Sequence, residues 1–124
     1  MEVSKIYLLV IILNKEEYLD EILESFLENE IPGGTIIDSN GMGSVLYCHN
    51  KLPTVGGIRQ LIFNQCRNHN KVILSVIDSE QKLERALELL QGEIVDFNEP
   101  GVGIHFSFPI DNVTGLAQTS KYEE

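Results

Sequence analysis

Two cysteines and two histidines in the middle of the chain are the residue types best suited to hold a metal ion. They are Cys48, His49, Cys66 and His69. Two thiolates and two imidazoles are the ligand types of a tetrahedral zinc site. However, adjacent Cys48 and His49 are a poor geometry for two ligands on one ion, and the segment lacks the usual short paired spacings. We therefore expect no metal site, and keep these four residues as candidate ligands for an alternative, metal-handling function.

Catalytic chemistry finds little support in the sequence. No nucleophile lies beside a base at a recognisable spacing, no carboxylates are paired in a loop, and there is no GxxxxGK phosphate loop. His105 lacks a serine or aspartate partner at a recognisable spacing, so we interpret it as a hydrogen-bonded interface histidine. We predict that the protein is not an enzyme.

Composition narrows the class of protein further. The chain has 124 residues and a net charge of −10. One domain is expected from the length, and the acidity argues against a nucleic-acid partner. We expect no signal peptide and no membrane span, since the longest apolar run, Ile6 to Leu13, is only eight residues. We expect a cytoplasmic protein with reduced thiols and no membrane insertion.

The secondary-structure elements that must position any site follow a pattern that occurs twice in the sequence. Residues 6–38 and 72–108 each read as strand, helix, strand. Residues 6–13 and 72–77 are nearly continuous in apolar side chains, which is typical of strands buried on both faces. Two βαβ halves in a small domain predict the α+β class. The expected fold is a ferredoxin-like split βαβ sandwich (βαββαβ), with an antiparallel four-stranded sheet and two helices on one face.

The remaining boundaries follow from capping residues and polarity. Further strands are expected at 35–39 and 103–108, and the two helices are expected to begin after Asn14, with Glu17 as its reciprocal partner, and after Asp78 or Ser79. We expect one domain over residues 1–117, a long insertion at 41–70, and a disordered tail at 118–124.

Two helices cover only one face of such a sheet. The strand at 6–13 nevertheless offers apolar side chains to both faces, and the chain has no spare element for the second face except the long loop. Self-association through the open sheet face is the economical solution, so we expect a homo-oligomer.

The long loop is the expected place for contact with other molecules. Within it, Ile58, Leu61, Ile62 and Cys66 share one helical stripe. A short amphipathic helix here could dock on a partner or fold back on the protein's own oligomer. Cationic residues cluster beside it and could receive an anionic ligand or an acidic surface; they are Lys51, Arg59, Arg67 and Lys71. We predict a partner-binding loop over 44–70 that uses Tyr47, Ile58, Arg59, Leu61 and Ile62.

Two glycine-rich stretches, 31–43 and 101–113, resemble the PII nitrogen regulatory protein family of signal-transduction proteins, in the right order within the doubled βαβ pattern. The resemblance implies a homotrimer that is not an enzyme, senses adenine nucleotides, often with 2-oxoglutarate, and regulates a partner through its long T-loop. It also implies a role in nitrogen metabolism. The positions implied to bind the effector, in clefts between subunits, are Thr35, Gly41, Gly43, Gly101 and Gly103.

The chain departs from the family at its charged positions. Ile104, Gly115 and Ala117 stand where the family has a lysine and two arginines, and Val45 stands at the glutamine that ligates metal and 2-oxoglutarate. Losing three cationic partners would cost about a thousandfold in affinity. We therefore do not expect Mg-ATP and 2-oxoglutarate sensing of the usual kind. We expect a less charged effector, such as a nucleoside, an adenylate or another small metabolite.

Two alternatives stay open. The glycines could serve only as turn residues at positive φ. The second alternative is a metal-binding trimer like those of the CutA family, which shares this fold. The net acidity and the four cysteine and histidine residues named above are the reasons for considering it.

Overall fold

The computed structural model describes residues 5–31, 33–42, 45 and 70–116 of the chain. Strand β1 (Ile6–Leu13) leads through a short 3-10 helix, η1 (Glu16–Tyr18), into helix α1 (Leu19–Glu28) and strand β2 (Gly34–Ser39). The second half contains strand β3 (Asn70–Ile77), helix α4 (Glu80–Leu89) and strand β4 (Gly103–Ile110). The predicted α+β class and the βαββαβ order are confirmed.

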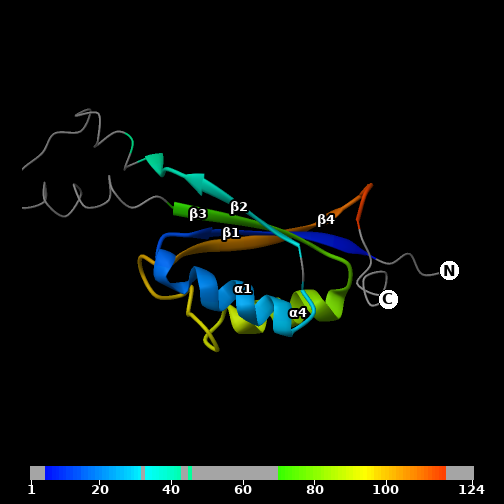
Figure 1. The fold of residues 1–124 in the computed structure, drawn as a ribbon, viewed down its shortest axis with the longest axis horizontal. Coiled ribbons are helices and arrows are strands. Elements are labelled where there is room, and N and C mark those ends of the chain that lie inside the picture. The colour runs from blue at the N-terminus through cyan, green and yellow to red at the C-terminus, as the bar shows by residue number, and fades with distance from the viewer. Residues whose placement is uncertain (1–4, 32, 43–44, 46–69, 117–124) are drawn as a thin grey trace, which may run out of the picture.

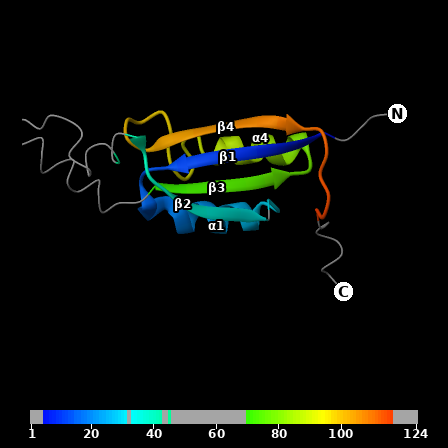
Figure 2. The same ribbon diagram turned by 90° about the horizontal axis from the view of Figure 1, so that it is seen from above.

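The four strands form one antiparallel sheet in the order β2-β3-β1-β4 (Figure 2). The two most apolar strands, β1 and β3, are therefore central, and β2 and β4 are the edges. The register places Leu13 of β1 opposite Lys71 of β3 and opposite Gly103 of β4, and places Ser39 of β2 opposite Asn70. The ends of all four strands next to residues 13, 39, 70 and 103 thus meet at one end of the sheet.

Both helices lie on the same face of the sheet, as expected (Figure 1). Side chains at alternate positions of β1 and β3 point toward them because successive residues of a strand face opposite sides. The core is the layer between sheet and helices, and its buried members are Leu9, Ile11, Leu13, Ile22, Phe26, Ile31, Ile73, Ile77, Leu83, Ala86, Leu89, Leu90, Val95 and Val102.

The other face of the sheet is apolar and no described element covers it. Its side chains belong to the alternate strand positions in register with Val10, which are Ile6, Leu8, Ile12, Ile37, Val72, Leu74, Val76, Ile104, Phe106, Phe108 and Ile110. Several are large and exposed, including Ile104 at 56%, Phe108 at 47% and Phe106 at 44%. We call this surface the open face. A contiguous apolar patch of this kind marks an interaction surface in a soluble protein.

Helix boundaries follow the sequence in part. The Ser79 hydroxyl caps α4 by accepting a hydrogen bond from the Lys82 backbone N–H at 3.2 Å, as predicted. The predicted capping box at Asn14 is wrong, since η1 intervenes and neither η1 nor α1 has a side-chain cap. Instead, the Asn14 backbone N–H donates to the Val102 carbonyl at 2.8 Å, which ties the end of β1 to the loop before β4.

The end of α1 has a paired hydrogen-bond pattern that closes the helix. The Ile31 N–H donates to the Phe26 carbonyl at 2.7 Å, and the Glu30 N–H donates to the Leu27 carbonyl at 3.1 Å. These are the two bonds of a Schellman motif, which needs a left-handed residue between them. Glu30 occupies that position with φ of 59°, although glycine is the residue suited to it.

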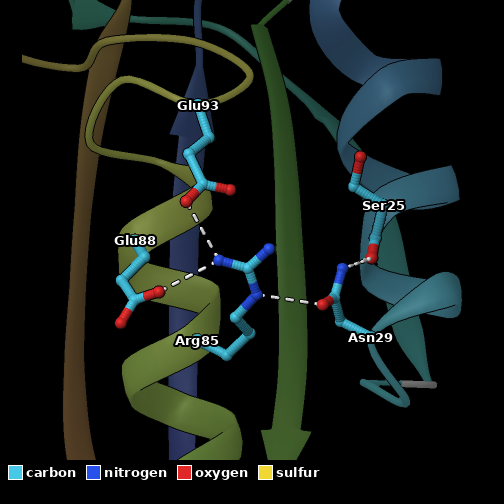
Figure 3. A network of polar contacts seen from close by, with 5 residues as sticks. All are labelled: Ser25, Asn29, Arg85, Glu88 and Glu93. Atoms are coloured by element: carbon cyan, nitrogen blue, oxygen red, sulfur yellow. Dashed lines mark hydrogen bonds and ion pairs between the residues drawn. The ribbon is translucent and has the colours of Figure 1, made fainter.

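A polar network joins the two helices at their solvent side (Figure 3). The Arg85 guanidinium on α4 donates to the Asn29 side-chain carbonyl at 2.9 Å, and to Glu88 and Glu93 at 3.0 Å each. The Asn29 amide in turn donates to the Ser25 carbonyl at 2.7 Å. The network therefore holds the end of α1, helix α4 and the start of the loop after α4 together.

Candidate functional site

The two glycine segments predicted to bind an effector lie at the same end of the sheet but at opposite edges. Gly41 follows β2, and Gly101 precedes β4, which begins at Gly103. Strands β3 and β1 lie between them, so three strand spacings of about 4.8 Å separate the two edges by about 14 Å. Within one subunit, the two segments are too far apart to hold the same small group.

The β2 segment turns immediately after the strand. The Val45 N–H donates to the Gly41 carbonyl at 3.0 Å, and the Asn70 amide lies 3.5 Å from where a Cβ at Gly41 would stand. Val45, at the family's glutamine position, is 40% exposed. Its side chain offers neither a metal ligand nor a hydrogen bond.

The β4 segment is fixed by backbone contacts. Gly103 has φ of 144°, and a Cβ on it would stand 2.1 Å from the carbonyl oxygen of Ile12 in the adjacent strand. No side chain fits there, so glycine is required by space as well as by φ. Gly101 also has positive φ, at 84°, but faces open space. These two glycines therefore differ: Gly103 is packed tightly in the sheet, and Gly101 leaves room for an approaching molecule.

One cation beside this segment had no signal in the sequence pattern. Lys15 follows Asn14, whose backbone is bonded to Val102 between the two glycines. Within the described residues, Lys15 forms no ion pair. It could have been found only from the strand register, since the end of β1 meets the start of β4 there.

Lys71, counted in the sequence among cations available to an anion, is already paired. Its ammonium bonds Asp38 of β2 and lies 3.7 Å from Glu16 of η1. The hydrogen bond to Asp38 is the main cause of a raised pKa for Lys71. Two carboxylates already engage this ammonium, so Lys71 is not a free anion receptor.

His105 differs from its predicted state. It lies on the helix-facing side of β4, with its ring edge-to-face against Phe97 at a centroid distance of 5.1 Å. Its Nδ1 is buried and has no hydrogen-bond partner in the described part of the chain. Burial lowers the pKa of the imidazole below its ordinary value of 6.5. The interpretation of a hydrogen-bonded interface histidine is therefore wrong for Nδ1, because this atom is buried without a polar partner in the described residues.

Thr35 is not brought to either glycine segment. It lies exposed in β2 opposite Leu74, four residues before Ser39, which is about 13 Å along the strand. Other predicted residues lie outside the described part of the chain; they are Gly43, Tyr47, Cys48, His49, Ile58, Arg59, Leu61, Ile62, Cys66 and His69, together with Ala117 and the tail at 118–124.

Residues 5–31, 33–42, 45 and 70–116 contain neither a metal-binding cluster nor a membrane-spanning helix. No group of three or more histidine, cysteine, aspartate or glutamate side chains in these ranges is arranged to hold a metal ion. None of the helices in these ranges is both long enough and apolar enough to cross a membrane.

Comparison with known proteins places the chain at the level of fold. No protein-family model matches it, and neither does any curated protein sequence. Solved structures do match. A PII-like signalling protein from Thermus thermophilus aligns with a TM-score of 0.56 and 18% identity, over 89% of this chain and 91% of its own.

Two further matches carry bound molecules. PII from Arabidopsis thaliana, bound to citrate, aligns with a TM-score of 0.56 and 19% identity, over 86% of this chain and 78% of its own. GlnK from Bacillus subtilis, in complex with ATP, aligns with a TM-score of 0.59 and 12% identity, over 89% and 85%. The chain thus has the fold of the PII-like signalling proteins, at low sequence identity.

Proposed function

We propose that this protein is a non-enzymatic PII-like regulator, which binds a small effector in clefts between the subunits of a homotrimer and acts on a partner protein through the segment 44–70. The observation that carries the proposal is the open face. Two helices cover one side of the sheet, and an apolar surface is left on the other. Packing of three such faces against one another would bury it.

The position of the glycine segments supports a cleft between subunits. Gly41 and Gly101 lie at opposite edges of one sheet, too far apart to enclose one small molecule. When copies of the chain pack around a common axis, the β2 edge of one subunit can approach the β4 edge of the next. Gly41 of one copy and Gly101 of another would then face the same cleft.

The chemistry of these edges favours an effector of low charge. The exposed backbone at Gly101 can approach a ligand closely, and Lys15 is the nearby cation without an ion pair in the described residues. Ile104 offers no charge, and Lys71 is neutralised by Asp38 and Glu16. One lysine in each cleft suits a nucleoside monophosphate or a small carboxylate better than a triphosphate.

The nature of the partner rests on fold-level analogy. A role in nitrogen metabolism is proposed because the matched fold is that of PII proteins. The predicted contact residues, Tyr47, Ile58, Arg59, Leu61 and Ile62, are proposed to meet the partner.

A thermal-shift panel tests the effector proposal. The panel contains ATP, ADP, AMP, adenosine, citrate, 2-oxoglutarate and zinc, with wild-type protein, Lys15→Ala and the control Lys5→Ala. An effector at a hundred times its dissociation constant adds about 2.7 kcal/mol to the free energy of unfolding, which raises the melting temperature measurably.

The expected result is stabilisation by AMP that Lys15→Ala weakens and Lys5→Ala retains, with a smaller effect of ATP and citrate. Absence of any shift in the whole panel would contradict this effector chemistry. A shift with ATP well above that with AMP would show that further cations reach the cleft.

A further inference from the structure

A concave site lies at the surface of one subunit, on the helix-facing side of β4. The cavity has a volume of about 250 Å³ and is lined by the end of α4, the loop after it and the start of β4, through Leu90, Gln91, Phe97, Asn98, Gly103, Ile104 and His105. Drug-sized ligands occupy cavities of about 300–1,000 Å³, so this one suits a smaller molecule.

Three polar side chains at this cavity are not engaged in hydrogen bonds. In the described part of the chain, the carboxamides of Gln91 and Asn98 have no partner. The His105 ring is partly exposed, and since its Nδ1 is the buried nitrogen, Nε2 is the polar atom that can reach a ligand. The tautomer with the proton on Nε2 avoids burying an N–H without an acceptor, so His105 offers a donor.

The charge at the cavity decides the class of ligand. None of the seven lining residues is charged at neutral pH, because burial keeps His105 in its neutral form. The loop that contributes Phe97 and Asn98 to the lining also carries Glu93, Asp96 and Glu99, of which Glu93 is paired with Arg85. An anion would therefore find no compensating cation among the lining residues.

The apolar part of the lining indicates the shape of the ligand. Leu90 and Phe97 form an apolar wall, and Phe97 is held edge-to-face by the His105 ring. Aromatic walls favour flat rings. Each carboxamide offers a donor and an acceptor, which together match a ligand edge that carries both, such as an amide.

We propose that this cavity binds a small, uncharged, planar molecule with an amide-type edge, held by Gln91, Asn98 and His105 beside Phe97. The site overlaps the predicted effector positions at Gly103, whereas Gln91, Asn98 and His105 are not among those positions. Its lining includes Gly103 and two residues of the loop that leads to Gly101. A molecule bound here would therefore brace the loop that forms one side of the proposed effector cleft.

Benzamide and benzoate are the matched probes, because they share ring and shape and differ in charge. The full-length protein, labelled with ¹⁵N, is titrated with each while amide chemical shifts are recorded. We expect benzamide to shift the amides of Phe97, Asn98 and Gly103 with a dissociation constant of about 1 mM, as suits so small a ligand. We expect benzoate to bind at least about tenfold more weakly, since no cation lines the cavity.

Asn98→Ala is the test variant and Gln81→Ala, on the exposed side of α4, is its control. Asn98→Ala keeps the backbone bond from residue 98 to Asp96 and removes only the carboxamide. We expect it to weaken benzamide about five- to tenfold, as for one lost hydrogen bond, and Gln81→Ala to leave binding unchanged.

Three results would overturn the proposal. These are no shift of the three amides with benzamide up to about 20 mM, benzoate binding as tightly as benzamide, and Asn98→Ala binding as well as the wild type. None of them would decide the proposed trimer or its effector, which are tested separately by the mass of the protein in solution and by Lys15→Ala.

Discussion

Gly103→Ala is expected to be among the most damaging single-atom additions to this fold. Gly103 begins β4 and lies opposite Leu13 of β1. An added Cβ would stand 2.1 Å from the Ile12 carbonyl oxygen and 3.1 Å from its carbon, which are backbone atoms of a central strand. The neighbour cannot turn aside as a side chain would, so the two strands must separate locally.

The size of the effect has two sources. The φ of 144° at Gly103 is a backbone conformation that costs a residue with a side chain about 1–3 kcal/mol. Parting the strands at this point loses one or two ladder hydrogen bonds, at about 1 kcal/mol each. The total of about 2–5 kcal/mol is a large share of the roughly 5–15 kcal/mol that stabilises a typical domain.

Gly101→Ala is the matched control. Gly101 also has positive φ, at 84°, but nothing lies within 4 Å of the added Cβ. Gly101→Ala is therefore expected to lower the free energy of unfolding only by the cost of a side chain in left-handed backbone, about 1–2 kcal/mol. Urea unfolding of both variants at equal protein concentration measures the difference. If Gly103→Ala lowers the midpoint no more than Gly101→Ala, the close packing of β4 against the Ile12 carbonyl is refuted.

Two further predictions concern single residues. Glu30→Gly is expected to raise the free energy of unfolding by about 1 kcal/mol, because Glu30 occupies the left-handed position of the α1 Schellman motif. Urea unfolding measures this change, and an unchanged or lower midpoint would contradict the motif. Burial lowers the pKa of His105 in the folded protein, so as pH falls the unfolded chain takes up this proton before the folded chain does. The free energy of unfolding is therefore unaffected by this group above about pH 6.5, and it decreases as pH falls from there toward the folded-state pKa. Thermal unfolding from pH 7.5 to 5 should show this loss in the wild type and less of it in His105→Gln, and identical pH profiles would count against the enclosed ring.

The fold could be predicted because two signals agreed. Apolar runs marked β1 and β3 as the central strands, and the repeated strand-helix-strand order left a single simple arrangement. The start of α1 could not be predicted in the same way. Asn14 carries a side chain suited to capping, but its backbone N–H is used by the Val102 carbonyl, a contact set by the sheet register far along the chain.

The candidate site was predicted less completely, for a geometric reason. Glycine spacing indicated which loops approach a ligand, but only the strand order shows that Gly41 and Gly101 lie at opposite edges. The alternation in β4 gave two faces without saying which one is covered. The structure shows that the polar side, with His105 and Ser107, faces the helices at the sheet edge, while Phe106 and Phe108 lie on the open face.

The mass of the protein in solution tests the central claim most directly. Light scattering after size exclusion is applied to the wild type, to Phe106→Asp on the open face, and to Leu27→Asp on α1, whose side chain is 72% exposed on the helix side. We predict about three times the chain mass of 14.0 kDa for the wild type and for Leu27→Asp, and a single chain mass for Phe106→Asp. A wild-type protein that runs as a monomer, or an oligomer that Phe106→Asp leaves intact, would contradict the packing of the open face and with it the cleft between subunits.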